Sequence, residues 1–455
     1  MTERSGGLRD WLRCPSVAAP FTDDALIGAM LRFEAALAAA QADCGLVPAA
    51  AAQTIAAVCA EHRPDPGALA RAARPASTLA IPLVQGLTEA VAARDAQAAG
   101  FVHFGATSQD VVDTALVLQA GAAGAALADL LHALGDALAA LARAHRATPM
   151  LGRTLLQPAV PITFGWKAAC WLGLVHRGAD GLARALREAA VLQFGGAAGT
   201  LAALGPHGDA VAQRLAAGLG LSLPDTSWHG ARDRLARLGA ELAILTGALA
   251  KIGRDVALLM QPEVGEAFEP TAAGRGGSSA MPHKRNPVGA MLAAEAAPRA
   301  SGLAAALFAT LPSEHERGLG GWQNTVFLVA DLFDAAGSAG DAVLEVIAGL
   351  RVAPAAMQRN LDAQRGFVFA EALATALAPA LGRGAAQSLA EAACAAAQAR
   401  GGSLRDAAAA DPRISGALDP RVLDALFTAP APGAADAMID RTLAAWAARP
   451  RGQPA

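Results

Sequence analysis

The segment 274–287 holds the residues best suited to chemistry in this chain. Its sequence, GRGGSSAMPHKRNP, contains three fixed cations, no acid and three glycines. The glycines free the backbone, and the serine hydroxyls stand beside several N–H groups that can donate hydrogen bonds to an anion. This composition predicts a mobile lid that closes over a polyanionic substrate. A disordered basic surface loop would also explain the glycines, but it fits Met281 and the two prolines less well.

A second segment, HFGATSQD at 103–110, is a polar turn directly before an apolar helical stretch. Hydroxyl and amide groups at the start of a helix form a ready anion site. The alternative is that Thr107, Ser108 or Asp110 only caps the helix. The residues alone leave both interpretations open.

A third segment, GRTLLQP at 152–158, carries Arg153 and Gln157. Its glycine and proline suggest a break between helices. Taken by itself, the segment is best interpreted as a helix-breaking connection with one exposed arginine.

Two charged clusters are secondary candidates. In WHGARDR at 228–234, Asp233 can pair with Arg237 one helical turn later, and His229 is a candidate to face a site. The EHER run at 314–317 is interpreted first as a solvated face or a helix end. Neither cluster alone indicates a reaction.

Three common catalytic motifs do not fit these segments. Lys284 is neither preceded by glycine nor followed by serine or threonine, as a phosphate-binding P-loop requires. Ala280 stands where a GxSxG elbow around Ser278 would have its last glycine. The pair His315-Glu316 lacks the second histidine of a zinc HExxH motif. The nucleotide, acyl-enzyme and metal classes therefore lose support.

Long helices are predicted to position these segments. Between Leu235 and Leu259 the apolar residues alternate spacings of three and four, which is the pattern of a helix-bundle seam. Leucines from Leu127 to Leu141 repeat this spacing within a second predicted helix, 120–146. No run of alternating β-branched residues indicates a strand. We therefore predict an all-α fold.

Proline and glycine clusters divide the chain into three predicted domains. Shorter amphipathic helices, the first beginning near Asp23 or Asp24, form an N-terminal domain at 1–105. The long seams and the loop 274–287 belong to a central domain at 106–350. Short helices return in a C-terminal domain at 351–455.

Composition narrows the class of protein. The chain has 455 residues, and 37 Lys and Arg against 40 Asp and Glu leave a net charge of −3 without a basic block, which disfavours nucleic-acid binding. The hydrophobic share is 54% with only 4% aromatic residues, which indicates helix packing by alanine and leucine. Charges interrupt the apolar stretches, so we expect no membrane segment. The N-terminus lacks the apolar core of a secretory signal and the five cysteines form no CxxC pair, so we expect a cytoplasmic protein.

The loop sequence GSSAMPHKRNP resembles the signature loop of the aspartase/fumarase superfamily, which includes adenylosuccinate lyase, argininosuccinate lyase and 3-carboxy-cis,cis-muconate cycloisomerase. HFGATSQD and GRTLLQ precede it in the order that this family requires, and the likeness extends over nearly the whole chain, including LRFEAALAAAQ, SWHGARDRL and EHERGLGGW. The details are most similar to the bacterial cycloisomerase branch. The resemblance implies a three-domain all-α fold and a homotetramer with a core of about 20 helices, in which three subunits contribute to each active site.

The resemblance also implies roles for individual residues. Ser278 corresponds to the loop serine that acts as carbon acid and base, and Lys284 and Asn286 correspond to the groups that hold a substrate carboxylate. The predicted catalytic residues are Ser278, Lys284 and His103. The predicted substrate-binding residues are Thr107, Ser108, Arg153, Gln157, Ser279, Met281, Asn286 and Arg317. The implied substrate is a small di- or tricarboxylate, and the implied reaction needs neither a metal nor an organic cofactor.

Two departures from the family indicate a particular chemistry. Adenylosuccinate and argininosuccinate lyases have a histidine where this chain has Leu155, and a glutamate where it has Met291. In those lyases the pair helps to protonate a departing nitrogen, which is a poor leaving group without help. A leaving group that is already a stable anion needs no such proton. We therefore predict proton transfer at a carbon alpha to a carboxylate, with the conversion of 3-carboxy-cis,cis-muconate to 4-carboxymuconolactone as the favoured reaction.

The sequence leaves three other functions open. The segment QNTV at 323–326 replaces an acidic, Trp-containing stretch of the cycloisomerases, and Ser77-Thr78 replaces their usual Gly-Asn. These differences suit a lyase that releases fumarate and a stable anion, such as nitrite from nitrosuccinate. A C–N lyase of the adenylosuccinate or argininosuccinate type is a weaker alternative. A catalytically silent structural relative is disfavoured, because His103, Ser278 and Lys284 are all present.

Overall fold

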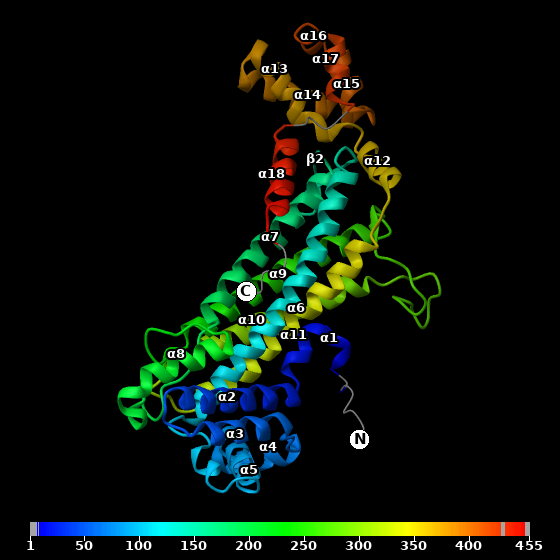
Figure 1. Cartoon of the computed structure of the whole chain (residues 1–455). Coiled ribbons are helices and arrows are strands. Elements are labelled where there is room, and N and C mark those ends of the chain that lie inside the picture. The colour runs from blue at the N-terminus through cyan, green and yellow to red at the C-terminus, as the bar shows by residue number, and fades with distance from the viewer. Residues whose placement is uncertain (1–6, 8, 429–432, 451–455) are drawn as a thin grey trace.

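The computed structural model describes residues 7, 9–428 and 433–450 of the chain. The described chain is built mainly of α-helices (Figure 1), so the predicted all-α class is confirmed. The α-helices are α1 Pro15–Ala18, α2 Asp23–Asp43, α3 Ala49–Glu61, α4 Pro66–Ala76, α5 Ala80–Ala92, α6 Ser108–Ala144, α7 Phe164–Ala189, α8 Gly208–Leu219, α9 Asp233–Met260, α10 Val288–Phe308, α11 Gly321–Ala348, α12 Pro354–Asp362, α13 Ala370–Leu381, α14 Arg383–Arg400, α15 Leu404–Ala410, α16 Pro412–Ser415, α17 Pro420–Leu426 and α18 Ala435–Ala447. Short 3₁₀ helices lie at Asp10–Leu12, Ala19–Phe21, Ala98–Phe101, Ala202–His207 and Phe367–Phe369. The strands are β1 Pro149–Thr154, β2 Gln157–Thr163, β3 Ala267–Phe268 and β4 Arg351–Val352.

The long helices α6, α7, α9, α10 and α11 pack against one another in a central bundle (Figure 1). On α9, the apolar residues predicted from the spacing of three and four are at most 4% exposed, so the predicted helix 235–259 is confirmed. The second predicted helix, 120–146, is part of α6, which already begins at Ser108. Burial of these seams removes apolar surface from water and drives the bundle together.

Shorter helices cover the two ends of the bundle. Helices α2 to α5 lie at one end, where α2 packs on α6 and α8, and α12 to α17 lie at the other end (Figure 1). Helices α13 to α17 share a smaller hydrophobic core that includes Leu373 and Leu404. The last helix, α18, returns alongside α7, and its Trp446 packs so closely on Gly135 of α6 that any side chain at this glycine would collide with the indole.

The expectation that no strands occur was wrong for short segments. β1 and β2 form an antiparallel hairpin, and β3 pairs with β4. The segment 152–158 is therefore a hairpin turn and not a helix-breaking connection. Thr154 pairs with Gln157 around Leu155 and Leu156, whose φ angles are 50° and 63°. Glycine or asparagine usually occupies such left-handed turns, so a leucine pair gave no hairpin signal in the sequence.

Two helices, α2 and α6, are long and apolar enough to cross a membrane by length and composition alone. Within the fold, 56% of the most apolar stretch of α2 and 67% of that of α6 are buried. Both helices belong to the main hydrophobic core. Helix packing therefore explains their apolar composition.

Candidate active site

The predicted segment 103–110 lies at the N-terminus of α6. Thr107 precedes the helix, and its backbone N–H donates to the Asp110 carboxylate at 2.9 Å. Its hydroxyl accepts a hydrogen bond from Nη1 of Arg317 at 2.7 Å, and Nη2 of that arginine donates to the carbonyl of Ala197. The segment therefore caps the helix and also joins a cation. The run 314–317, interpreted from the sequence as a solvated face or a helix end, lies in the loop before α11, and its Arg317 reaches this cluster.

His103 lies beside Thr107 and is paired with an acid that the sequence analysis did not single out. Its Nδ1 lies 2.7 Å from Oε1 of Glu34 on α2. Burial lowers the pKa of His103, but the hydrogen bond and charge of Glu34, with a smaller effect of Asp110, outweigh it and leave the pKa above its ordinary value. His103 can therefore carry a proton at a higher pH than a free histidine.

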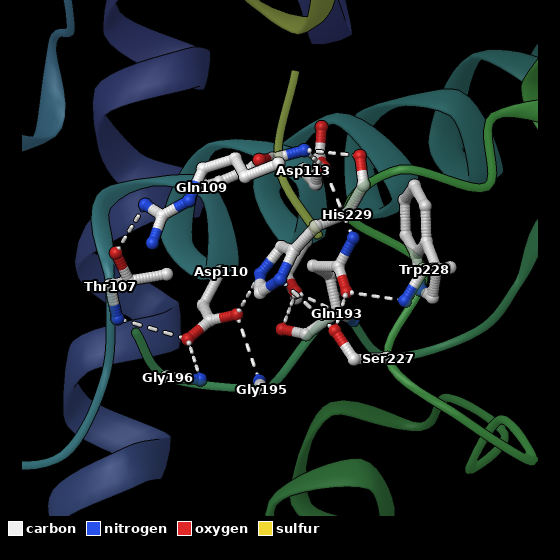
Figure 2. A network of polar contacts seen from close by, with 12 residues as sticks. Thr107, Gln109, Asp110, Asp113, Gln193, Gly195, Gly196, Ser227, Trp228 and His229 are labelled. Atoms are coloured by element: carbon white, nitrogen blue, oxygen red, sulfur yellow. Dashed lines mark hydrogen bonds and ion pairs between the residues drawn. The ribbon is translucent and has the colours of Figure 1, made fainter. Parts of the chain in front are cut away.

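Asp110 is the centre of a buried polar network behind Thr107 (Figure 2). Its carboxylate accepts hydrogen bonds from the backbone N–H groups of Gly195 and Gly196, both at 3.0 Å, and pairs with Nε2 of His229 at 2.7 Å. His229 is 2% exposed, so it faces this network and not an open site. The network fixes the start of α6 against the loop at 195–196.

A buried ion pair between Arg232 and Asp113 extends this network along α6. Both terminal nitrogens of Arg232 donate to the Asp113 carboxylate, one of them at 2.9 Å. The side-chain amides of Gln109 and Gln193 donate to the same carboxylate at 2.9 and 3.2 Å. The pair is almost fully buried and surrounded by hydrogen bonds, so it holds α6 to the segment that leads into α9.

Replacing Asp113 by alanine is expected to lower the free energy of unfolding by about 3–5 kcal/mol, because the charge of Arg232 would stay buried without its partner. Urea unfolding of the purified protein measures this loss. The matched control is Asp233→Ala, which removes the exposed i,i+4 partner of Arg237 at 3.8 Å and should change stability by less than about 1 kcal/mol. Equal losses in the two variants would contradict the structural role of the buried pair.

The predicted segment 152–158 lies at the opposite end of the bundle, in the β1–β2 hairpin. Arg153 donates from both terminal nitrogens to Glu266, at 2.8 and 2.7 Å, and the Asn360 amide donates to the same carboxylate at 2.8 Å. Gln157 is exposed beside the hairpin tip. Both terminal nitrogens of Arg153 therefore already bind the carboxylate of Glu266 within the same chain. That Arg153 binds the substrate stays a prediction.

The loop 274–287 leaves the same end of the bundle between β3 and α10. Arg275 at its start is bound to Glu269 and Glu345, so this cation anchors the loop and is not available to a substrate. Glu269 also accepts the N–H groups of Gly289 at 3.0 Å and Ala290 at 2.8 Å, which caps α10. The composition of the loop indicated three fixed cations and no acid, but the acidic partners of Arg275 lie outside the loop and were not visible in its sequence.

Within the loop, the predicted catalytic serine has a defined local geometry. The Oγ of Ser278 accepts hydrogen bonds from the backbone N–H groups of Ala280 at 3.3 Å and Met281 at 3.1 Å. Ser279, Met281 and Lys284 are exposed. The N–H of Asn286 donates to the carbonyl of Gly276 at 2.8 Å and closes the base of the loop. The loop thus presents its polar groups outward from a fixed base.

Within one chain, the predicted site residues lie in two separate clusters. The histidine cluster contains His103, Thr107, Ser108 and Arg317. The serine cluster contains Arg153, Gln157 and the loop 274–287. The two lie toward opposite ends of α6, whose 37 residues span about 55 Å at 1.5 Å per residue. A single chain therefore does not bring His103 and Ser278 together.

The fold and these clusters define a class of protein. Residues 14–302 match the family model described as lyase, and residues 366–442 match the model described as adenylosuccinate lyase C-terminus. The chain belongs to the lyase family, within the aspartase/fumarase superfamily, and the resemblance found in the sequence is confirmed.

Individual relatives narrow this assignment. The chain is 48% identical to 3-carboxy-cis,cis-muconate cycloisomerase of Bradyrhizobium diazoefficiens over 96% of its own length and 97% of the relative. It is 42% identical to nitrosuccinate lyase of Streptomyces davaonensis, with 94% of this chain and 92% of the relative covered. The crystal structure of 3-carboxy-cis,cis-muconate lactonizing enzyme from Pseudomonas putida superposes with a TM-score of 0.91 at 43% identity, covering 97% of this chain and 99% of the other. The chain is therefore an enzyme of the lyase and cycloisomerase type.

Proposed function

We propose that the protein converts 3-carboxy-cis,cis-muconate to 4-carboxymuconolactone. The observation that carries this proposal is the chemistry of two positions. Leu155, at the hairpin tip, is 96% exposed, and Met291 on α10 is 59% exposed. Neither side chain can donate a proton, so the site suits a leaving or attacking group that stays an anion. The relatives named as cycloisomerases support the same substrate.

In the proposed reaction, one carboxylate oxygen of the substrate bonds to the alkene carbon that carries the 3-carboxyl group. The alkene electron pair moves to the neighbouring carbon and is delocalised into the carboxylate next to it. Ser278 gives its hydroxyl proton to this carbon and regains a proton from water. The N–H groups of Ala280 and Met281 that donate to Oγ stabilise negative charge on that oxygen during the transfer.

The cations of the site would stabilise the same transition state. Lys284 and Asn286 are proposed to hold the carboxylate on which negative charge develops, and the histidine cluster is proposed to bind another carboxylate. Closure of the loop 274–287 would exclude water and strengthen these interactions. The proposal needs no metal and no organic cofactor.

We further propose that the complete site forms between chains in a homotetramer. The separation of the histidine and serine clusters along α6 supports this, because the chemistry needs both. Large apolar side chains are also exposed on the central helices, including Ile244 on α9, Phe308 on α10 and Phe327 on α11, at 61%, 44% and 55%. Exposed apolar surface of this kind is typical of a subunit interface. In this assembly the central helices of four chains would form the 20-helix core that the resemblance implies.

The proposed domains are 1–105, 106–350 and 351–455. The separate hydrophobic core formed by α13 to α17 supports the last of them. We propose a cytoplasmic location, because the free cysteines suit a reducing compartment. Small carboxylates, and neither nucleic acid nor membrane, are the proposed partners.

The second candidate function is release of fumarate and nitrite from nitrosuccinate. The similarity to a nitrosuccinate lyase and the altered segments at 77–78 and 323–326 favour it. Proton balance separates the two reactions. Lactone formation turns a substrate with three carboxylates into a product with two and takes up one proton, whereas elimination of nitrite releases one.

The deciding experiment offers each substrate to the protein in a weakly buffered solution with a pH indicator. Loss of carboxymuconate absorbance with alkalinisation supports the cycloisomerase. Acidification with formation of fumarate and nitrite would replace that proposal with the lyase. Turnover of neither compound would reject both.

A further inference from the structure

Glu34 is a buried acid whose position the reaction scheme does not yet explain. It lies on α2 within the apolar stretch LRFEAALAAAQ and is only 1% exposed. Its Oε1 is bound to Nδ1 of His103, and its Oε2 is buried without a hydrogen-bond partner in the described part of the chain. A buried carboxylate is costly unless a cation or several donors stabilise it. An imidazolium at His103 supplies that charge.

The same helix holds the loop around His103 at a second point. The amide of Gln41 on α2 donates to the carbonyl of Phe104 at 2.6 Å. His103 and Gly105, on either side of Phe104, have φ angles of 59° and 75°, in the left-handed region. Non-glycine residues adopt this region at a cost, so the contacts from α2 stabilise a loop conformation that places the ring against Glu34.

We propose that Glu34 is a positioning residue, which holds His103 as a protonated donor for a carboxylate of the substrate. This inference rests on the proposed function. With Nδ1 bound to Glu34, Nε2 is the ring nitrogen left for the ligand. Among the described residues, no hydrogen-bond partner is present for Nε2. The second N–H of the imidazolium therefore serves a polyanionic substrate. Four residues later in the chain, the hydroxyl of Thr107 holds the guanidinium of Arg317.

The surrounding groups fit this protonation state. Burial, and then the charge of Glu34, raise the pKa of Cys59 on α3 to about 12, so this thiol stays neutral. Asp110 on α6 adds negative charge near His103 and favours its protonated form. Glu34 interacts with Cys59, and His103 interacts with Asp110, whose effect on the histidine is smaller than that of Glu34. Removal of the Glu34 charge should therefore lower the pKa of His103.

The test compares Glu34→Gln, which keeps the shape of the side chain and removes its charge, with the native protein. We expect the alkaline limb of the kcat/KM profile for 3-carboxy-cis,cis-muconate to move to lower pH by about one unit or more. The limb moves to lower pH because His103 releases its proton more easily once the negative charge of Glu34 is removed. At pH values above this limb, kcat/KM should fall mainly because KM rises, since protonated His103 binds the substrate carboxylate.

The matched control is Asp43→Asn, the same carboxylate-to-amide change on the same helix. Asp43 is exposed, lies 3.6 Å from Arg214, and stands nine residues after Glu34, about 13 Å further along α2. Its pH profile should equal that of the native protein. A purely structural role of Glu34 would lower activity at every pH without moving the limb, and this result would overturn the proposal.

A second readout keeps the inference separate from the proposed reaction. NMR titration of protein labelled with ¹³C at histidine Cε1, with His103→Asn to assign the signal, reports the pKa of His103 without turnover. The pKa should fall in Glu34→Gln and stay unchanged in Asp43→Asn. An unchanged pKa in Glu34→Gln would refute the inference, even if the protein is active.

If neither proposed substrate reacts, the proposed function fails, and with it the role of Glu34 toward that substrate. Should Glu34→Gln fail to fold, Glu34→Asp keeps the charge and should restore both folding and the raised pKa.

Discussion

Replacing Ser278 by alanine is expected to lower the turnover of 3-carboxy-cis,cis-muconate by about 10³-fold or more, because a general acid or base contributes about 10²–10⁴-fold to a reaction. The melting temperature should change little. Ser278 is only half-buried, and its hydroxyl contacts the N–H groups of Ala280 and Met281 within its own loop. Steady-state kinetics and thermal unfolding of the same preparation measure the two effects.

The matched control is Ser301→Ala on α10. Its hydroxyl is exposed and donates to the carbonyl of Ala297 at 3.0 Å, away from the loop. This variant should retain native turnover. If Ser278→Ala retained native turnover as well, Ser278 would be removed from the mechanism and the proton would have to come from another group.

Mixing two inactive variants, His103→Ala and Ser278→Ala, is expected to restore activity. In the proposed assembly, the histidine and serine clusters of one site come from different chains. Random hybrids formed from equal amounts would contain both native clusters in about one quarter of their sites, because each cluster is native with even odds. Co-refolding of the two variants followed by an activity assay measures the recovery.

The control mixture combines His103→Ala with His103→Asn, in which every histidine cluster is defective. It should stay at the low activity of the separate variants. Absence of recovery in the first mixture, with tetramers present, would mean that both clusters act within one chain or that the clusters do not form a common site.

The fold was largely predictable because it depends on local patterns. The spacing of three and four along α9 specifies one buried face, and that face is the bundle seam. The β1–β2 hairpin was not predictable in the same way. Its turn uses Leu155 and Leu156 in place of the residues that normally mark a left-handed turn, and both are exposed.

The site was predictable in its segments and not in their partners. The loop sequence indicated Ser278 and Lys284, but nothing in it indicates that Glu269 and Glu345 bind Arg275. Glu34 gave one physical signal, a single acid within an apolar helical stretch. Its pairing with His103 joins residues 69 positions apart, and only the packing of α2 against the start of α6 brings them together.

The most direct test of the central claim is proton NMR of the product formed from 3-carboxy-cis,cis-muconate in D₂O. The proposed reaction should give 4-carboxymuconolactone with one deuteron in the CH₂ group beside the side-chain carboxylate, formed at the native rate only when Ser278 is present. Absence of the lactone, or equally fast formation of the same deuterated lactone by Ser278→Ala, would contradict it.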